Sequence, residues 1–307
     1  MQYQNGKRYR TMSQYCGEKY GGRIVKIPLC SGATCPNRDG SKGIGGCSFC
    51  SGDGGGEFAP KRPIPLSEQY EEGIRFNLKW PDAVKVGYFQ SFSNTYMPIE
   101  QLEAMLAQTA KLPDIGGIRI ATRADCIDEQ KADMLAKYAE HLPIEVELGL
   151  QTIHEQTSKI INRCHSLEEW QAGFSLLKQR GIYVCAHLIN GLPGESDEMM
   201  IRSARWLAKQ RVDGVKLHML HIIHGSQLAV QYQNQPFELL SLEQYVDIVC
   251  AQIRELPPQT VIERLTGDGA KSTLIAPIWT LNKRNVLNSI DKRLSQLNAW
   301  QGDRFEG

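Results

Sequence analysis

Short apolar runs rich in β-branched residues recur along this chain and alternate with segments of helical periodicity. The runs lie at residues 23–29, 83–89, 116–122, 144–150, 182–189 and 213–220. Two of the intervening helical segments begin with a capping box, formed by Ser166 with Glu169 and by Ser241 with Gln244. Alternating strands and helices predict parallel strands joined by right-handed crossovers. Six such units predict an α/β fold, a partial (β/α)6 parallel barrel, with functional groups at the carboxyl ends of its strands.

The predicted strands carry polar residues on one face. In the run that starts at residue 144, Glu145, Glu147 and Gln151 point to the side opposite the apolar residues, because strand side chains alternate. Lys216 and His218 share a face in the same way. A parallel strand buries apolar residues under its covering helices, so the polar face must line the barrel interior. The pattern predicts a cavity lined by polar groups, with an internal salt-bridge network as the alternative.

Three regions follow from the change of pattern along the chain. Residues 1–22 form a basic N-terminal arm, and residues 23–230 form the barrel core. Residues 231–307 are a C-terminal extension that we expect to pack on the barrel as a cover, with a short possible strand at 259–265.

Charge and cysteine content narrow the class of protein. With 35 Lys and Arg against 34 Asp and Glu, the chain as a whole does not attract nucleic acid or anionic membrane. No apolar leader precedes the barrel and no segment approaches 18 consecutive apolar residues, so we expect a cytoplasmic protein without a membrane partner. Nine cysteines, mostly single, make a poor disulfide framework and favour reduced thiols with one metal centre.

The candidate metal centre is the segment CPNRDGSKGIGGCSFC at residues 35–50. Cys35, Cys47 and Cys50 are spaced C-x11-C-x2-C, and Cys30 would complete a four-ligand set for a structural zinc. Three thiolates also fit a [4Fe-4S] cluster with one iron left open. Glycines in the loop favour the bulkier group, since they let backbone approach it closely. The loop follows the first strand, which places it at the catalytic end of a barrel.

Eight motifs resemble the radical S-adenosylmethionine (SAM) superfamily. They are residues 35–50, YFQSFSNT (88–95), ATRADC (121–126), ELGLQT (147–152), INRCH (161–165), HLINGLPGE (187–195), GVKLHMLHIIHGS (214–226) and RLTGDG (264–269). Within the superfamily they are similar to the YtqA/YhcC group, which is related to the catalytic subunit of Elongator. SGDGGGEFAP (51–60) and WTLNK (279–283) resemble the YtqA branch of that group. The resemblance implies a barrel of the radical SAM type.

The resemblance also implies cofactors and their ligands. Cys35, Cys47 and Cys50 would hold an iron-sulfur cluster, and SAM would chelate its open iron. Reductive cleavage of SAM would give a 5′-deoxyadenosyl radical that abstracts hydrogen from the substrate, while the protein positions the cofactors. Strand ends and chemistry, such as the fit of a guanidinium to a carboxylate, select candidate SAM contacts. These are Phe49, Gln90, Ser91, Glu147, Gln151, Arg163 and Asn190.

The substrate implied by the resemblance is the wobble uridine of tRNA. The expected step of tRNA modification converts a 5-carboxymethylaminomethyl group, with or without 2-thiolation, to 5-aminomethyl, after which a separate methylase acts. Lys216, His218 and Arg264 are candidates for binding the modified base or its carboxylate. The basic arm around Lys7 to Arg10, with its tyrosines, is a candidate for phosphate contacts in the tRNA anticodon stem-loop. The reaction also implies a reductant such as flavodoxin or ferredoxin.

Two other functions remain compatible with the residues. One is a radical SAM enzyme that acts on a small metabolite or a peptide. The other is a zinc-bound nucleic-acid module without catalysis, whose metal binding would depend on Cys30.

Overall fold

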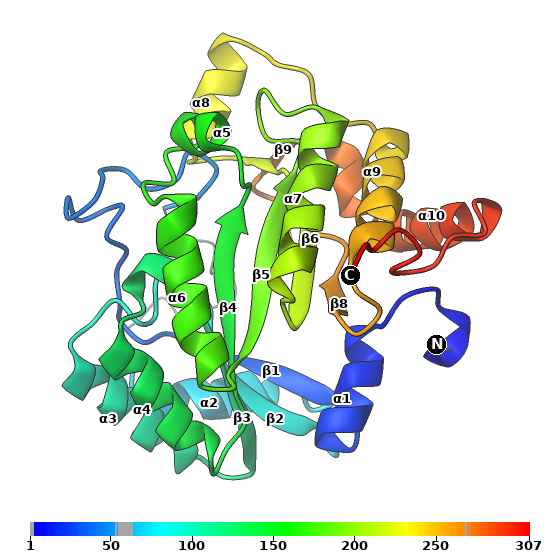
Figure 1. Ribbon diagram of the computed structural model, residues 1–307. Helices are drawn as coiled ribbons and strands as arrows, with labels where there is room; N and C mark the ends of the chain where they lie inside the picture. Colours follow the sequence, from blue (N-terminus) through cyan, green and yellow to red (C-terminus); the bar gives the residue numbers. More distant parts are fainter. Residues whose placement is uncertain (1–2, 53, 55–63, 268, 270) are drawn as a thin grey trace.

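Seven parallel strands form one curled sheet that makes up the wall of a partial barrel (Figure 1). The computed structural model describes residues 3–52, 54, 64–267, 269 and 271–307. The strand order in the sheet follows the sequence. The strands are β1 (Ile24–Leu29), β2 (Val84–Phe89), β3 (Ile115–Thr122), β4 (Ile144–Gln151), β5 (Tyr183–Asn190), β6 (Gly214–Met219) and β8 (Val261–Arg264). The first six are the predicted strands, and the α/β barrel prediction is confirmed.

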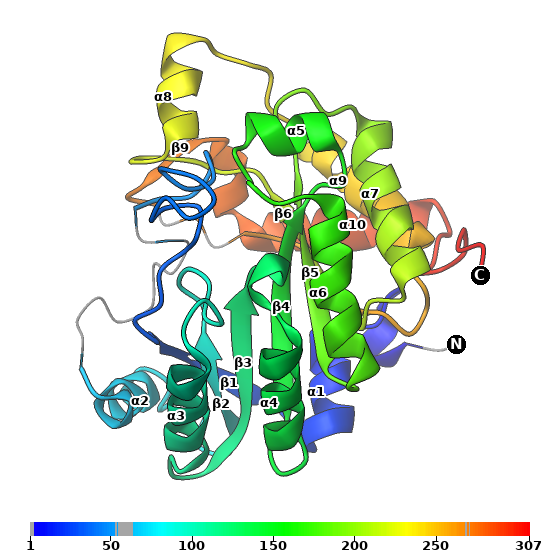
Figure 2. The same cartoon turned by 60° about the vertical axis from the view of Figure 1, so that its left-hand side comes forward.

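Helices cover the outer face of the sheet (Figure 2). The helices of the described residues are α1 (Met12–Tyr20), α2 (Leu66–Arg75), α3 (Ile99–Ala110), α4 (Glu129–Ala139), α5 (Glu155–Ile160), α6 (Leu167–Gln179), α7 (Asp197–Gln210), α8 (Gln227–Asn234), α9 (Leu242–Glu255) and α10 (Lys283–Gln296). Those that pack on the strands of the sheet from outside include α2, α3, α4, α6 and α7, whereas α8 packs on β7 and α10 on α9. A short antiparallel pair, β7 (Ile222–Ile223) with β9 (Leu274–Ala276), lies near the carboxyl ends of the strands. Single 3-10 turns are η1 (Gln4–Gly6), η2 (Ala124–Cys126) and η3 (Ile278–Leu281). No helix among the described residues is long and apolar enough to span a membrane.

Local signals in the sequence set where two helices begin. Ser166 accepts a hydrogen bond from the backbone of Glu169, whose side chain in turn accepts one from the backbone of Ser166 at the start of α6. Ser241 and Gln244 make the same reciprocal pair at the start of α9. Each capping box satisfies backbone N–H groups that have no partner within the helix. Both predicted helix starts are therefore confirmed.

The alternation along the strands separates an apolar core from a polar interior. Val146, Leu148 and Leu150 of β4 are fully buried in the main core cluster, between the sheet and its helices. Glu145 and Glu147 of the same strand are also buried, but on the inner face. Fully burying one aliphatic side chain stabilises the fold by about 1.5–3 kcal/mol, so the outer face drives the association of helices with the sheet.

The C-terminal extension contributes to the wall as well as to the cover. Its predicted strand is β8, which pairs in parallel with β6 and makes the seventh strand of the sheet. Helix α9 packs on α7, and α10 packs on α9. The extension therefore completes one side of the barrel.

The N-terminal arm closes the amino-terminal end of the barrel. Tyr15 and Tyr20 of α1 donate hydrogen bonds of 2.6 and 2.9 Å to Glu145, near the start of β4. Lys7 forms an ion pair with Asp291, and Tyr9 is buried. These groups of the arm have partners within the fold, and the expected contact with tRNA phosphates stays a prediction. Arg8 likewise stacks on Trp300, and Arg10 pairs with Glu18.

A charge-balanced network fills the barrel between this floor and the strand ends. It contains three cations, Lys26, Arg119 and Lys216, and three carboxylates, Glu145, Glu147 and Glu263. Arg119 is fully buried and is the only one of these cations that contacts all three carboxylates. The alternative interpretation of the polar strand faces, an internal salt-bridge network, is therefore confirmed for this layer of the barrel.

Removing Arg119 should destabilise the protein strongly. Arg119→Ala leaves three carboxylates buried with one cation fewer, and we expect the free energy of unfolding to fall by about 3–5 kcal/mol. Urea denaturation followed by circular dichroism measures it. Arg202→Ala is the matched control, since Arg202 is 58% exposed and meets Glu198 only at 4.0 Å; its expected cost is about 0–1 kcal/mol. Equal effects of the two substitutions would contradict the structural role of the network.

Acid should destabilise the barrel through Glu263. Burial by itself raises the pKa of Glu263, but the charges of Arg119, Lys26 and Lys216 and a hydrogen bond from Arg119 together outweigh burial and lower this pKa from 4.5 to about 2. A depressed pKa stabilises the folded state fully above pH 4.5, and this stability is lost as the pH falls from 4.5 towards 2. The urea midpoint of Glu263→Gln should therefore differ less between pH 7 and pH 3 than the midpoint of the wild type does. Glu140 is exposed, and the control Glu140→Gln should show the wild-type difference. An unaltered difference in Glu263→Gln would refute this assignment.

Candidate functional site

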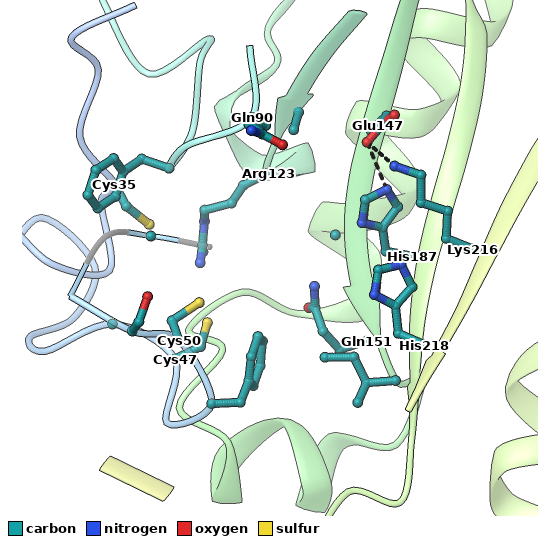
Figure 3. A pocket seen from close by; sticks show the side chains of 18 of the residues that line it. Cys35, Cys47, Cys50, Gln90, Arg123, Glu147, Gln151, His187, Lys216 and His218 are labelled. Carbon is teal, nitrogen blue, oxygen red and sulfur yellow. Dashed lines mark hydrogen bonds and ion pairs between the residues drawn. The ribbon is translucent and has the colours of Figure 1, made fainter. Parts of the chain in front are cut away.

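A cavity of about 350 Å³ opens at the carboxyl ends of the strands. One wall is the cysteine loop that follows β1, and the facing wall consists of side chains from β4, β5 and β6 (Figure 3). Tyr88 of β2 and Arg264 of β8 also line it. The cavity thus draws on strands from both edges of the sheet, as expected for a parallel barrel.

The cysteine wall brings together the three predicted ligands. Cys35, Cys47 and Cys50 line the cavity, while Cys30 is not among its lining residues. Cys30 instead belongs to the end of β1, where its backbone N–H donates to Gln69. Within the described residues no group of three or more His, Cys, Asp or Glu side chains lies close enough to hold one metal ion. This spacing does not favour a single tetrahedral zinc, whose ligands all lie about 2.3 Å or less from one ion.

Asparagine side chains hold the cysteine loop in place. Asn162, in the INRCH motif, donates to the carbonyl groups of Ile44 and Gly46 at 3.3 and 2.9 Å. Asn37 of the loop donates to the carbonyl of Asn162, at 2.5 Å, and approaches the sulfur of Cys47 at 3.6 Å. These bonds join the loop to the segment after α5, far away in the sequence.

Gly46 allows the Arg38 side chain to pack closely on the cysteine loop. Its φ is +82°, a conformation that favours glycine, and a Cβ there would lie 2.9 Å from the guanidinium of Arg38. The expected close approach of glycine backbone to a prosthetic group stays a prediction.

The thiol of Cys47 is suited to act as a ligand. A hydrogen bond with Cys50 and the charge of Arg123, together with smaller effects of Asn37 and Arg163, outweigh burial and lower the pKa of Cys47 to about 7. The same pairing raises the pKa of Cys50. Since the thiolate is the form that binds metal, Cys47 is the member of the pair that releases its proton more readily.

Two arginines, Arg123 and Arg163, line the cavity together with the cysteines. Arg163 donates to the carbonyl groups of Leu150 and Thr152 through one nitrogen and to that of His165 through another. Its remaining nitrogen, Nη2, is buried and has no hydrogen-bond partner among the described residues. Arg123 forms a two-bond pair with Asp125 at 2.8 and 2.9 Å and lines the cavity beside the cysteines.

Glu147 joins the facing wall to the buried ion network. Its carboxylate accepts hydrogen bonds from Lys26 and Arg119 at 3.1 Å, from Tyr88 at 2.6 Å and from Lys216, and it lies 3.2 Å from Nε2 of His187. A carboxylate offers about four lone-pair positions, so these four donors take up nearly all of its accepting capacity. Glu147 therefore lines the cavity with partners other than the predicted ribose or amine of SAM.

The other predicted residues divide into two groups. Those that line the cavity are Phe49, Gln90, Gln151, Arg163, Lys216, His218 and Arg264. Ser91 and Asn190 do not. Ser91 is buried just past β2 and its carbonyl accepts from Asn94, while Asn190 exchanges two 2.8 Å hydrogen bonds with Gln252 of α9. Most of SGDGGGEFAP, and Asp268 of RLTGDG, lie outside the described residues.

Gln151 enters the cavity through an unusual backbone conformation. Its φ is +62°, uncommon for a residue with a side chain. The pairing of β4 with β5 shifts register between Gly149 and Gln151, and the Gln151 amide lies over Gly149, where a Cβ would be 2.6 Å away. Gly149 is therefore needed for the position of Gln151.

Sequence reasoning missed Arg123, Tyr88 and His187. The alternation that identified Glu147 also places His187 on the inner face of β5, and Tyr88 lies on the inner face of β2. Arg123 directly follows β3, where a functional side chain is expected. Strand alternation and the position directly after a strand could therefore have identified all three residues from the sequence.

The described lining is rich in positive charge. Five cations line it against one carboxylate, Glu147, and the cations are Arg38, Arg123, Arg163, Lys216 and Arg264. Such a lining attracts anionic ligands, because charges of one sign in a cleft raise the local concentration of counter-charged molecules.

Comparison with known proteins identifies the family. Residues 33–207 match the model of the radical SAM superfamily, and residues 212–296 match the radical SAM C-terminal domain. The chain is 41% identical to uncharacterized protein YtqA of Bacillus subtilis over 98% of its length and 94% of that protein. It is 33% identical to protein YhcC of Escherichia coli over 91% of its length and 89% of that protein.

A solved structure agrees in fold. Archaeal Elp3 from Methanocaldococcus infernus, with an N-terminal deletion, superposes with a TM-score of 0.69 at 17% identity. The match covers 91% of this chain and 64% of that one. Together with the family models and the curated relatives, the cysteine wall and the curled parallel sheet lead to one conclusion: this chain belongs to the radical SAM superfamily of enzymes, which use a [4Fe-4S] cluster and SAM.

Proposed function

We propose that Cys35, Cys47 and Cys50 hold the [4Fe-4S] cluster and leave one iron for SAM. The three thiols line one wall of the same cavity, whereas Cys30 does not. The thiolates of a cluster bind different irons, so they need not converge on one ion. The lowered pKa of Cys47 supports this ligand set.

SAM would lie between the two walls. The unpartnered Nη2 of Arg163 is suited to its carboxylate, since guanidinium groups bind carboxylates strongly. Gln90 and Gln151 provide amide groups for its polar atoms. Phe49 packs in a small apolar cluster with residues such as Leu220 and offers a surface for adenine. When bound, the cluster and SAM supply the radical chemistry, and these side chains orient SAM and exclude water.

The reaction we propose is the conversion of a 5-carboxymethylaminomethyl group on the tRNA wobble uridine to 5-aminomethyl. The observation that carries it is the position of Lys216 in the wall facing the cysteines (Figure 3), in a cavity that Arg264 of β8 also lines. A cationic group there can hold the substrate carboxylate and present the neighbouring methylene to the cofactors, which supports a step that begins by removing hydrogen from that carbon. His218 is held neutral, because burial and the nearby His187 and Arg264 lower its pKa well below 6.5.

An anticodon-loop base is a substrate that can enter such a cavity at little energetic cost. An anticodon-loop base is already accessible as single-stranded RNA, so little energy is needed to bring it into a cavity. This part of the proposal rests on the similarity to the YtqA group and on the anion-attracting lining. A small acidic metabolite or a peptide is the competing class of substrate.

Cysteine substitutions test the cluster ligands. After anaerobic reconstitution, Cys47→Ala should lose the brown cluster absorbance and most of its iron, because one of three thiolate ligands is gone. Cys30→Ala should retain both at the wild-type level. Iron and sulfide analysis with visible spectroscopy measures this. A colourless wild-type protein whose zinc binding depends on Cys30 would contradict the proposal.

Nucleoside analysis tests the reaction. Reconstituted enzyme with SAM, a reductant and tRNA from cells lacking this protein should convert the carboxymethylaminomethyl nucleoside to the aminomethyl nucleoside. Deuterium on the methylene beside the nitrogen should appear in 5′-deoxyadenosine. The Cys47→Ala enzyme should neither convert the nucleoside nor transfer deuterium. Product formation without transfer of deuterium would refute the site of hydrogen removal, and an unchanged nucleoside profile would refute the substrate.

A further inference from the structure

His187 stands at the centre of the wall that faces the cysteines (Figure 3). It comes from the inner face of β5, pairs in register with Lys216 of β6, and has a side chain that is 22% exposed. Its ring stacks on that of His218, with centroids 5.6 Å apart and planes inclined by 19°. The proposed SAM contacts and the proposed carboxylate contacts do not use this side chain.

The contact with Glu147 orients the imidazole. Nε2 of His187 lies 3.2 Å from a carboxylate oxygen of Glu147, and that nitrogen is buried. A carboxylate only accepts, so a hydrogen bond across this contact requires the proton on Nε2 and leaves Nδ1 as the basic nitrogen. The ring is not yet turned fully into line for a hydrogen bond, as is common for catalytic groups before the substrate binds.

Glu147 itself is held firmly in place. Lys26, Arg119, Lys216 and Tyr88 fix its two oxygens from four other strands. The orientation of His187 is thus set by a buried network, which is the arrangement that lets a histidine act at a defined tautomer.

We propose that His187 is a general base that takes a proton from the secondary amine of the substrate. The proposal rests on the proposed function, in which the substrate carries this amine beside the methylene that loses hydrogen. An alkyl amine is mostly protonated at neutral pH. Its N–H bond breaks, the electron pair stays on the nitrogen, and the proton bonds to Nδ1 of His187. The freed lone pair can then stabilise electron deficiency at the adjacent carbon, and the imidazolium is stabilised by Glu147.

The surroundings distinguish His187 from its stacked neighbour. Burial and then Lys216 lower the pKa of His187, so the ring is neutral at pH 7. Glu147 acts in the opposite direction and stabilises the imidazolium that forms when the ring takes up a proton. The charged and titratable groups around it are Glu147 from β4, Lys216 and His218 from β6, Glu263 from β8 and Tyr88 from β2. His218 has cations and histidines around it and no carboxylate contact among the described residues, so it is a poorer acceptor.

Two variants test the base in the reconstituted enzyme. His187→Gln should lower product formation at pH 7 by about 10²–10⁴-fold, the usual contribution of a general base. The deficit should shrink as the pH rises, because solvent then deprotonates the amine. SAM cleavage without tRNA should remain at the wild-type level. His141→Gln, an exposed histidine before β4, is the matched control and should behave as wild type.

The possible outcomes distinguish failure of the proposed base role of His187 from failure of the proposed function. A His187→Gln enzyme with wild-type rate and pH profile overturns the base role, as does an equal loss at every pH, which indicates a structural effect. If wild type itself forms no product, the proposed function is wrong and the base role falls with it.

Nitrogen-15 NMR of histidine-labelled protein without cofactors gives a readout independent of turnover. We expect the His187 ring to carry its proton on Nε2 and to titrate below pH 6.5, with the signal assigned by its loss in His187→Gln. A ring protonated on Nδ1 at neutral pH would overturn the proposal.

Discussion

The buried ion network around Arg119 is the constraint on which the arrangement of this barrel depends. Charges in a low-dielectric interior are tolerated only when they are paired and hydrogen-bonded. Here three cations meet three carboxylates, and Tyr15, Tyr20, Tyr88 and Tyr183 donate to the carboxylates. The network therefore ties all seven strands of the sheet and the first helix together. It also forms the floor of the cavity, so the same interaction that holds the barrel together supports the site.

Glu147 belongs both to the buried ion network and to the lining of the cavity. Its contact with Arg119 is part of the network, and its contact with His187 lies in the cavity wall. A change in the charge of Glu147 would therefore disturb both the fold and the proposed base. We infer that the polar interior serves stability and function through shared residues.

Backbone strain is concentrated near the same site. Phe92, Gln151, Asn162 and Cys164 have φ between +52° and +62° although none is glycine. Phe92 and Gln151 line the cavity, Asn162 holds the cysteine loop, and the carbonyl of Cys164 accepts from Arg123. Such conformations persist only where surrounding contacts enforce them, and they often occur at functional sites. The loops between the strands are thus positioned by tertiary contacts rather than by local preference.

Local sequence patterns were sufficient to predict the strands and the two capped helices and to single out the cysteine motif, because strand alternation and helix capping depend on only a few neighbouring residues. They also placed Glu147, Gln151, Lys216 and His218 on inward faces. Only the tertiary structure decided what each of these groups contacts. It brought four hydrogen-bond donors to Glu147, paired Asn190 with Gln252, packed the N-terminal arm against the amino-terminal end of the barrel and set His187 beside Glu147. These partners come from segments far apart in the sequence, and in a buried interior the choice among them depends on which side chains the fold brings together.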